Sequence, residues 1–378
     1  MPARHFILVF LLAAAASATA LHLLDRQQTA RPPGERFVLE RKIASAIADG
    51  HHAGLPSGLN EAAVRWDIAR LLPAAPEIAV FGSSHSVRIS STMLAARRSM
   101  NFSIAGGALS DHLITTEILV ERQLRPRVWL IFVDAWLFDG DTDFGVWHQR
   151  SDLLARMESR LDHLAQPTLQ PVFDEDFVGD SLPAKLTGYS LDPLVEATDQ
   201  RLRESFLHVT IVDNPAGPMP VLRADGAFQP PMEIRPEDEP TASELAERQL
   251  AQNADRHRYG NFAWIDDRRW QLFTRWIQFC QSDGAEVWLV LPPYHPAIYQ
   301  RILANPQNQL SRIELRSREL ARQDGARLFG SYDPAKNGLG EGDFYDGDHL
   351  NDRGLKRLLA PLSILLARSA SPLPATPP

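Results

Sequence analysis

A short apolar run that ends at a glycine is the feature that most constrains how this chain can fold. Residues 78–86 read Ile-Ala-Val-Phe-Gly-Ser-Ser-His-Ser. Four consecutive apolar residues before a glycine are typical of a buried strand, and residues 87–98 are compatible with a helix. An α/β enzyme places its nucleophile at such a turn, because the turn exposes a side chain beside unpaired backbone N–H groups. A simpler interpretation of this stretch alone is that Ser83 or Ser84 caps the helix.

A second polar stretch lies near the other end of the chain. Residues 344–351 read Phe-Tyr-Asp-Gly-Asp-His-Leu-Asn and precede a segment with helical spacing. Serine hydrolysis needs a base for the hydroxyl and a carboxylate that orients the base. His349 and Asp346 provide both groups, with Asp348 as a rival for the orienting role. A solvated loop with an aspartate cap on the last helix is the alternative.

Strand-like and helix-like segments alternate along most of the chain. This alternation predicts an α/β fold, a three-layer α/β/α sandwich with a mainly parallel sheet. The candidate residues follow expected strands or lie on late loops, so we expect them to meet at one edge of the sheet. The expected strands are 77–81, 100–104, 127–133, 286–291 and 326–329, and the expected helices are 35–48, 61–72, 111–124, 268–282, 310–323 and 355–367.

Charge and cysteine content exclude several classes of site. The 378 residues carry a net charge of −8, and no long run of Lys and Arg is present, which argues against nucleic acid as the main partner. Cys280 is the only cysteine, so neither an intramolecular disulfide nor a thiolate metal site can form. We expect no cofactor.

The N-terminus has the character of an export signal. Basic Arg4 precedes the largely apolar stretch Phe6–Leu24. This pattern predicts a secretory signal peptide or an uncleaved signal anchor within residues 1–25. Small-residue cleavage patterns are present, but the apolar run continues beyond them to Leu24, which favours an anchor. The bulk of the chain would then lie outside the cytoplasm, in the periplasm and attached to the inner membrane.

The two polar stretches together resemble a known family. Gly82-Ser83-Ser84 is similar to the first block of the SGNH (GDSL-like) hydrolase superfamily, with Ser83 in place of the usual Asp. Residues 346–349 resemble its last block, Asp-x-x-His, and the two blocks occur in the family's order. The resemblance implies that Ser84 is the nucleophile, His349 the base and Asp346 its orienting partner. The extracytoplasmic branch, which includes periplasmic alginate O-acetyltransferases and the D-alanine transfer protein, is the most similar.

The same resemblance implies an oxyanion hole, with one departure from the family pattern. Acyl transfer develops an oxyanion that two or more donors must meet. The family uses the nucleophile's N–H and a glycine N–H, which correspond here to Ser84 and to Gly106 or Gly107; without the resemblance, Gly106-Gly107 can equally be a simple turn. The family's third block also supplies an Asn, whereas this chain has Asp134 at that point. A charged carboxylate there would repel the oxyanion.

Residues after two other expected strands are candidates for substrate contacts. Asp134 and Trp136 follow the strand 127–133, and Trp136 offers an apolar or sugar-stacking wall. Tyr294 and His295 follow the strand 286–291, where open α/β sheets bind ligands. Core packing for Trp136 and loop structure for Tyr294 and His295 are the alternatives.

These features divide the chain into five parts. After residues 1–25 come a linker and N-terminal helices at 26–76. Residues 77–137 and 266–368 form the expected α/β core. Residues 138–265 form a large insertion, whose length is typical of lids, partner surfaces or disorder. A Pro- and Ser-rich tail at 369–378 is expected to be disordered.

The sequence favours an extracytoplasmic serine esterase or O-acyltransferase. It would act on acyl groups, acetyl by family resemblance, of a cell-envelope or exported polysaccharide, with an acylated glycan or polysaccharide acceptor as partner and a membrane-bound O-acyltransferase as a further expected partner. The missing Asn motivates an alternative, a non-catalytic carbohydrate-binding or assembly protein with the same fold. A metal-dependent hydrolase that uses Asp346, Asp348 and His349 is a weaker third reading.

Overall fold

The computed structural model describes residues 37–56, 58–95, 98–140, 147–164, 209–231, 240–253 and 259–369. The expected signal segment 1–25, nearly all of the expected disordered tail and much of the insertion lie outside these ranges. Within the described part, no helix is both long enough and apolar enough to span a membrane.

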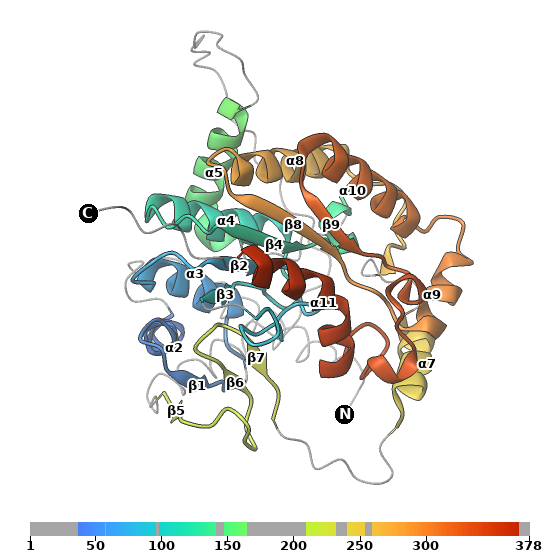
Figure 1. The fold of residues 1–378 in the computed structure, drawn as a ribbon, viewed down its shortest axis with the longest axis horizontal. Helices are drawn as coiled ribbons and strands as arrows, with labels where there is room; N and C mark the ends of the chain where they lie inside the picture. Colours follow the sequence, from blue (N-terminus) through green and yellow to red (C-terminus); the bar gives the residue numbers. More distant parts are fainter. Residues whose placement is uncertain are drawn as a thin grey trace, which may run out of the picture.

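Five parallel strands form the central sheet, as the alternation of segments predicted. The chain enters the sheet at β2, continues to β3 on one side and then crosses to β4 on the other side (Figure 1). Ligands of open α/β sheets bind where the connections diverge in this way, here at the carboxyl ends of β2 and β4. The spatial order is β3 (Ser99–Asn101), β2 (Ile78–Phe81), β4 (Val128–Phe132), β8 (Glu286–Leu291) and β9 (Arg327–Gly330).

Apolar side chains cover both faces of this sheet. In β2, Ala79 and Phe81 belong to one buried cluster, and Ile78 and Val80 belong to another. Such strands read as continuous apolar runs because successive side chains point to opposite, equally buried faces. The first cluster includes α3 (Glu61–Leu71), α4 (Leu109–Glu121), α8 (Asp267–Gln281) and α10 (Leu310–Asp324), and the second includes α11 (Asp352–Ser369). The architecture is therefore mixed α/β and compatible with an α/β sandwich.

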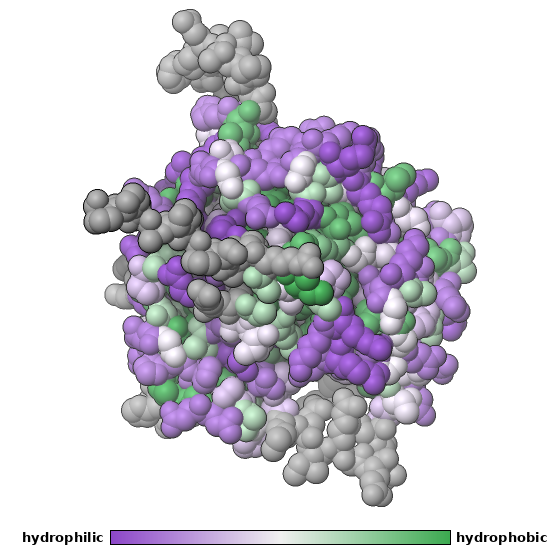
Figure 2. Space-filling model, in the orientation of Figure 1, coloured by the Kyte–Doolittle hydropathy of each residue, from purple (hydrophilic) through white to green (hydrophobic). Residues whose placement is uncertain are grey.

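The helices α8 and α10 illustrate how sequence spacing sets orientation. In α8, Phe273, Trp276 and Ile277 recur at helical spacing and are all fully buried. Hydrophilic residues predominate on the surface over these helices, at the upper edge of the view in Figure 2. The apolar stripe thus faces the sheet while the polar face meets solvent.

Part of the insertion pairs with the N-terminal region in a second sheet. This sheet is antiparallel, and its strand β1 comes from the chain before the core, whereas its other strands come from the insertion. Its order is β5 (Ile211–Val212), β1 (His52–Gly54), β6 (Val221–Leu222) and β7 (Phe228–Gln229). The remaining described α-helices also contribute residues to the first cluster: α2 (Val38–Ala48), α5 (Ser151–Leu164), α7 (Ala242–Asn253) and α9 (Pro296–Leu303).

The helix expected over residues 87–98 does not form. Residues 84–88 and 91–95 are turns, and residues 96–97 lie outside the described part. The Asn101 side-chain amide donates to the carbonyls of Ser86, Val87 and Ile89, at 2.8, 3.2 and 3.0 Å. These carbonyls would otherwise accept bonds within a helix, so tertiary hydrogen bonds replace helical ones.

Candidate active site

The turn after β2 depends on a glycine. Gly82 has φ of 154°, a conformation that residues with a Cβ rarely adopt. A Cβ at this position would also lie 2.6 Å from Phe132 Cβ and collide with the Ser86 hydroxyl. The chain can therefore pass this close to β4 only as glycine, and Ser84 follows two residues later.

Serine hydroxyls and the carboxylate of Asp134, two residues after β4, hold the turn in place. The Ser86 Oγ lies 3.0 Å from the Ser83 carbonyl oxygen and 2.8 Å from Ser103 Oγ. Asp134, which is fully buried, accepts the Ser83 N–H at 3.1 Å and lies 2.5 Å from His85 Nδ1. Because a carboxylate only accepts, His85 Nδ1 carries the proton in this pair. Asp134 thus fixes the residues on both sides of Ser84.

Ser84, His349 and Asp346 form a continuous hydrogen-bonded chain. The Ser84 Oγ lies 2.8 Å from His349 Nε2. On the other side of the ring, His349 Nδ1 lies 2.9 Å from Asp346 Oδ2 and 3.1 Å from Oδ1. The carboxylate accepts from Nδ1–H, which leaves the Nε2 lone pair to accept the serine O–H. This is the arrangement in which imidazole can take the hydroxyl proton.

Asp346 rather than Asp348 orients the histidine. Besides Nδ1, the Asp346 Oδ1 accepts the backbone N–H of Asp348 at 2.9 Å and of His349 at 2.8 Å. Asp348 lies farther away, 3.4 Å from Nδ1. Burial raises the pKa of Asp346, but the hydrogen bonds and charge of His349 and the backbone N–H groups outweigh it and bring the pKa down to about 2. Asp346 therefore stays ionised at neutral pH.

Aromatic rings also contact the His349 imidazole. Tyr345 stacks on it with ring centroids 5.5 Å apart and planes 17° apart. The His85 ring lies 5.4 Å away and is tilted by 46°. Both contacts limit rotation of the base, so its Nε2 stays directed at Ser84.

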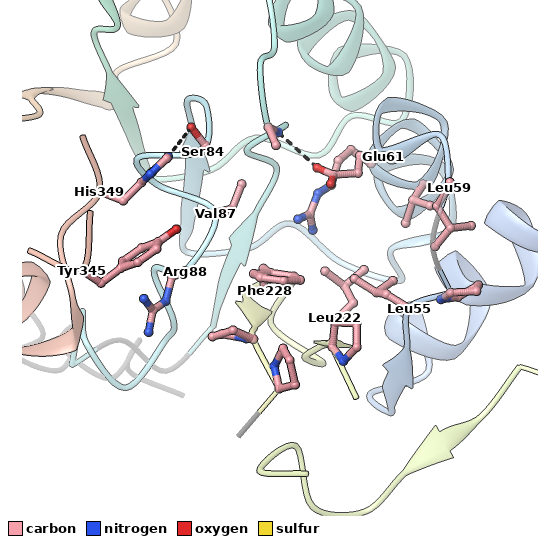
Figure 3. A pocket seen from close by; sticks show the side chains of 18 of the residues that line it. Leu55, Leu59, Glu61, Ser84, Val87, Arg88, Leu222, Phe228, Tyr345 and His349 are labelled. Carbon is pink, nitrogen blue, oxygen red and sulfur yellow. Dashed lines mark hydrogen bonds between the residues drawn. The ribbon is translucent and has the colours of Figure 1, made fainter. Parts of the chain in front are cut away.

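Two backbone amides are available for an oxyanion. The N–H groups of Ser84 and Gly106 form no hydrogen bond within the described residues. The Gly107 N–H, in contrast, donates to the Ile104 carbonyl at 2.8 Å. The Gly107 N–H is therefore already engaged, and of the two glycines it is Gly106 whose N–H remains available. Glu61 steadies this loop by accepting the Ala105 N–H at 3.1 Å (Figure 3).

A cavity of about 930 Å³ opens beside Ser84 and His349. Arg88 and Tyr345 lie next to His349, and the Arg88 guanidinium lies over the Tyr345 ring at 5.6 Å (Figure 3). Arg88 is also paired with Asp352 at 2.5 Å. The remaining lining residues come from the N-terminal region, the loop after β3, the insertion and the last loop: Leu55, Pro56, Gly58, Leu59, Glu61, Val64, Arg65, Val87, Ala105, Pro220, Leu222, Phe228, Pro230, Pro231 and Asn351.

Arg65 is a buried brace on one wall of this cavity. Its Nη1 donates to the carbonyls of Asn101 and Gly226, and its Nε donates to that of Ser103. Desolvation lowers the pKa of Arg65 to about 10, so it is still charged at neutral pH. The bond to Gly226 fastens the β6–β7 turn of the insertion to the end of β3.

The four expected substrate contacts have other roles. None of Asp134, Trp136, Tyr294 and His295 is among the residues that line the cavity. Asp134, Tyr294 and His295 are fully buried, and Trp136 is 7% exposed, with its Nε1–H on the Gly107 carbonyl. His295 caps α9 by accepting the Ala297 N–H at 3.3 Å. The structure therefore does not bring these four side chains to the cavity.

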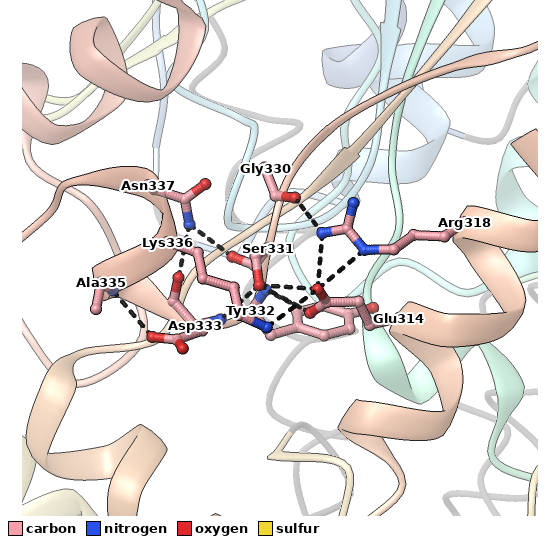
Figure 4. A network of polar contacts seen from close by, with 9 residues as sticks. All are labelled: Glu314, Arg318, Gly330, Ser331, Tyr332, Asp333, Ala335, Lys336 and Asn337. Carbon is pink, nitrogen blue, oxygen red and sulfur yellow. Dashed lines mark hydrogen bonds and ion pairs between the residues drawn. The ribbon is translucent and has the colours of Figure 1, made fainter.

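A polar network behind the site supports the carboxyl edge of the sheet (Figure 4). Glu314 on α10 accepts the Ser331 hydroxyl at 2.8 Å and the Arg318 guanidinium at 2.7 Å. Tyr332, which follows Ser331, donates its O–H to the carbonyl of Val133 at 2.7 Å. Val133 is the residue before Asp134. The network thus helps to position the end of β4 and, through Asp134, the turn that carries Ser84.

Several residues of the site could not be assigned from the sequence. His85 adjoins Ser84, and Arg88 lies four residues after Ser84, but neither belongs to a motif. Leu222 and Phe228 lie in a proline-rich insertion whose pairing with β1 has no local signal. Only the tertiary structure brings them to Ser84.

The carboxylates beside His349 are also close enough to share a cation. Ligand atoms of Asp346, Asp348 and His349 lie within 4.8 Å of one another. An ion at Nδ1 would have to displace the hydrogen bond to Asp346. The donor set therefore fits the orienting role better than a metal centre.

Comparisons with known proteins add no family assignment. The sequence matches no protein-family model and no curated protein. The family resemblance therefore rests on the two motifs.

Proposed function

We propose that the protein is a serine-dependent acyl-transfer enzyme, either an esterase or an O-acyltransferase. One observation carries this proposal: the Ser84 Oγ is 2.8 Å from His349 Nε2, while the opposite ring nitrogen is 2.9 Å from the Asp346 carboxylate. The nucleophile comes from a part of the chain distant from the base and its orienting group, and hydrogen bonds join the three in sequence. The cavity gives an ester access to the hydroxyl.

The reaction would run in two steps. In the first, Ser84 Oγ attacks the acyl carbon, its proton moves to His349 Nε2, and the leaving alkoxide takes that proton as the ester C–O bond breaks. In the second, water or an acceptor hydroxyl gives its proton to Nε2 and attacks the acyl-enzyme, and Ser84 regains the proton as it leaves. Both tetrahedral intermediates carry an oxyanion, which the N–H groups of Ser84 and Gly106 would meet.

The arrangement favours an enzyme over a binding protein. The alternative rested on the missing Asn, and Asp134 in its place seemed to threaten the oxyanion. Asp134, however, is buried beneath the turn and engaged by Ser83 and His85, so its charge does not line the cavity. Two free amides still satisfy the minimum for an oxyanion hole.

The finer assignments belong to this proposal through the motif resemblance. They are an SGNH-type fold, a periplasmic location with an N-terminal membrane anchor, a cell-envelope or exported polysaccharide as acceptor, and a membrane-bound O-acyltransferase as partner. The structure supports them only in that its parallel sheet and triad order agree with such a protein.

Mass spectrometry after brief incubation with p-nitrophenyl acetate tests the proposal. The full chain should gain one acetyl group on Ser84 and release nitrophenol, and the Ser84→Ala variant should do neither. Ser90→Ala, which changes another buried serine outside the chain of hydrogen bonds, serves as the control and should still be labelled. An acetyl group on another residue, or equal release of nitrophenol by Ser84→Ala, would remove Ser84 from the mechanism.

A further inference from the structure

The cavity beside Ser84 has two chemically different ends. Ser84, His349, Tyr345 and Arg88 lie together at one end (Figure 3). At the other end lie Leu222, Leu55 and Leu59, with Phe228 between the two groups of side chains.

The apolar end is built from aliphatic and proline side chains. Leu222 and Val64 are almost completely buried, and Leu55 and Leu59 are partly buried against the main apolar cluster. Four prolines elsewhere in the lining add further apolar surface without a backbone N–H: Pro56, Pro220, Pro230 and Pro231. None of these side chains can form a hydrogen bond, so a sugar ring placed here would lose its hydrogen bonds to water without replacement.

Two charged side chains of this region bind backbone groups of the surrounding loops. Glu61 accepts the Ala105 N–H, and Arg65 donates to three carbonyls. Both therefore act mainly as braces of the surrounding loops. The apolar character of the wall is what remains to select a ligand.

The insertion holds this wall against the nucleophile turn. The Phe228 N–H donates to the Val87 carbonyl at 2.7 Å, three residues after Ser84. A chain attached to Ser84 Oγ would pass Val87 and Phe228 before reaching Leu222 and Leu55. The wall is thus a continuation of the acylation site.

From these observations we infer that the cavity binds the hydrocarbon chain of a medium-length acyl group. This inference rests on the proposed function and names a longer acyl group than the acetyl group that the family resemblance implies. A cavity of about 930 Å³ is of the size that encloses a drug-sized ligand, and an acetyl group would leave most of it unfilled. A longer chain would bury its methylenes against the leucines, with a gain for each one.

Turnover of p-nitrophenyl acetate, butanoate, hexanoate and octanoate below their micelle-forming concentrations tests this inference. We expect kcat/KM to rise about threefold for each added methylene until the wall is filled, with all turnover lost in Ser84→Ala. Leu55→Gln keeps side-chain size but adds an amide to the wall, and should lower the octanoate-to-acetate ratio about tenfold. Leu315→Gln is the matched control, since Leu315 is 67% exposed on α10 outside the cavity, and should leave the ratio unchanged.

A flat or falling profile with Ser84-dependent turnover of acetate would overturn the inference and leave the proposed function standing. Calorimetric titration of sodium octanoate and sodium acetate into the wild-type protein gives a readout that needs no turnover. Tighter binding of octanoate, weakened by Leu55→Gln, supports the inference even where no ester is cleaved. Equal affinity for the two anions would overturn it.

Discussion

The turn at residues 82–86 and the loop at residues 344–351 meet at the Ser84–His349 hydrogen bond but are held in different ways. They are named the nucleophile turn and the acid–base loop after their proposed roles. The nucleophile turn is buried: Ser83 and Ser86 have no exposed surface, and their partners come from β4 and from the loop after β3. The acid–base loop is partly exposed, with the side chains of His349 and Asp346 at 17% and 13%. Several of its hydrogen bonds are local: Asp346 Oδ1 accepts the backbone N–H groups of Asp348 and His349.

This difference separates two kinds of sensitivity. Changes in the nucleophile turn should disturb the core and reduce the free energy of unfolding. Changes to the polar side chains of the acid–base loop should mainly alter the reaction and cost less stability, because His349 and Asp346 are partly exposed and lie outside the apolar clusters. Four predictions test the contrast.

Replacing Asp346 with Asn should have the largest effect. The amide cannot hold His349 in the tautomer whose Nε2 accepts the serine proton, so kcat should fall by about 10³- to 10⁴-fold. Stopped-flow measurement of nitrophenol release checks this. Asp348→Asn is the matched control and should cost less than about tenfold, since that carboxylate is 3.4 Å from Nδ1 and makes the weaker contact. A larger loss for Asp348→Asn would reverse the assignment of the orienting residue.

Gly82→Ala should destabilise the fold by about 2 to 4 kcal/mol. The new methyl group would contact Phe132 and the Ser86 hydroxyl, in a backbone conformation that is strained for alanine. Urea unfolding measures the change. Gly338→Ala is the control, because Gly338 also has positive φ, 66°, but no atom lies within 4 Å of an added Cβ. It should cost only about 1 kcal/mol; equal losses in the two variants would mean that close packing at Gly82 is unimportant.

The ionisation of Asp346 should stabilise the fold by about 2 kcal/mol at neutral pH. Its pKa is about 2 in the folded protein, below the ordinary value of 3.8. A lowered pKa stabilises the fold above the unfolded value, and this contribution is lost as pH falls from about 4 to 2. Unfolding free energies of wild type and Asp346→Asn, measured across this range, should converge as the pH falls. Parallel curves would show that Asp346 is not stabilised by its partners.

The smallest effect is expected from Gln249→Ala. The Gln249 side chain on α7 accepts the Gly347 N–H at 2.8 Å, which is a hydrogen bond between the insertion and the acid–base loop. Its loss should lower kcat about three- to tenfold with little change in stability, because the loop would gain freedom while its local bonds persist. Gln323→Ala, on the exposed side of α10, should change neither. A fall of more than about 2 kcal/mol in the free energy of unfolding would show that Gln249 mainly stabilises the fold.

The sheet could be predicted from the sequence because its signals are local. Residues 128–133 of the expected strand 127–133 are all apolar, as is typical of a strand buried on two faces, and the structure has β4 at Val128–Phe132. The expected strand 100–104 is shorter in the structure, Ser99–Asn101. Arg65 donates to the carbonyls of Asn101 and Ser103, and the Asp225 carbonyl of the insertion accepts the Asn101 N–H. The helix over 87–98 was wrong for a similar reason: Asn101 and Asp225 bind groups that a helix would have used.

In the candidate site, too, the residues in short motifs could be predicted, whereas roles that depend on tertiary contacts could not. Motif order alone placed Ser84, Asp346 and His349 in one site, and the structure brings them into contact. Spacing could not show which glycine keeps a free N–H, because the turn of Gly107 toward Ile104 depends on the loop geometry. It also could not show that Asp134 lies beneath the nucleophile rather than in front of it.

For this protein, the sequence by itself determined the parallel sheet, the position of the turn and the residues of the hydrogen-bonded triad. These depend on the period of apolar residues and on short motifs, which act within a few residues. The tertiary structure decided the role of Asp134, the choice of Gly106 and the composition of the cavity wall. Those depend on segments far apart in the chain, such as β1 and β6, whose pairing buries surface that neither shows alone.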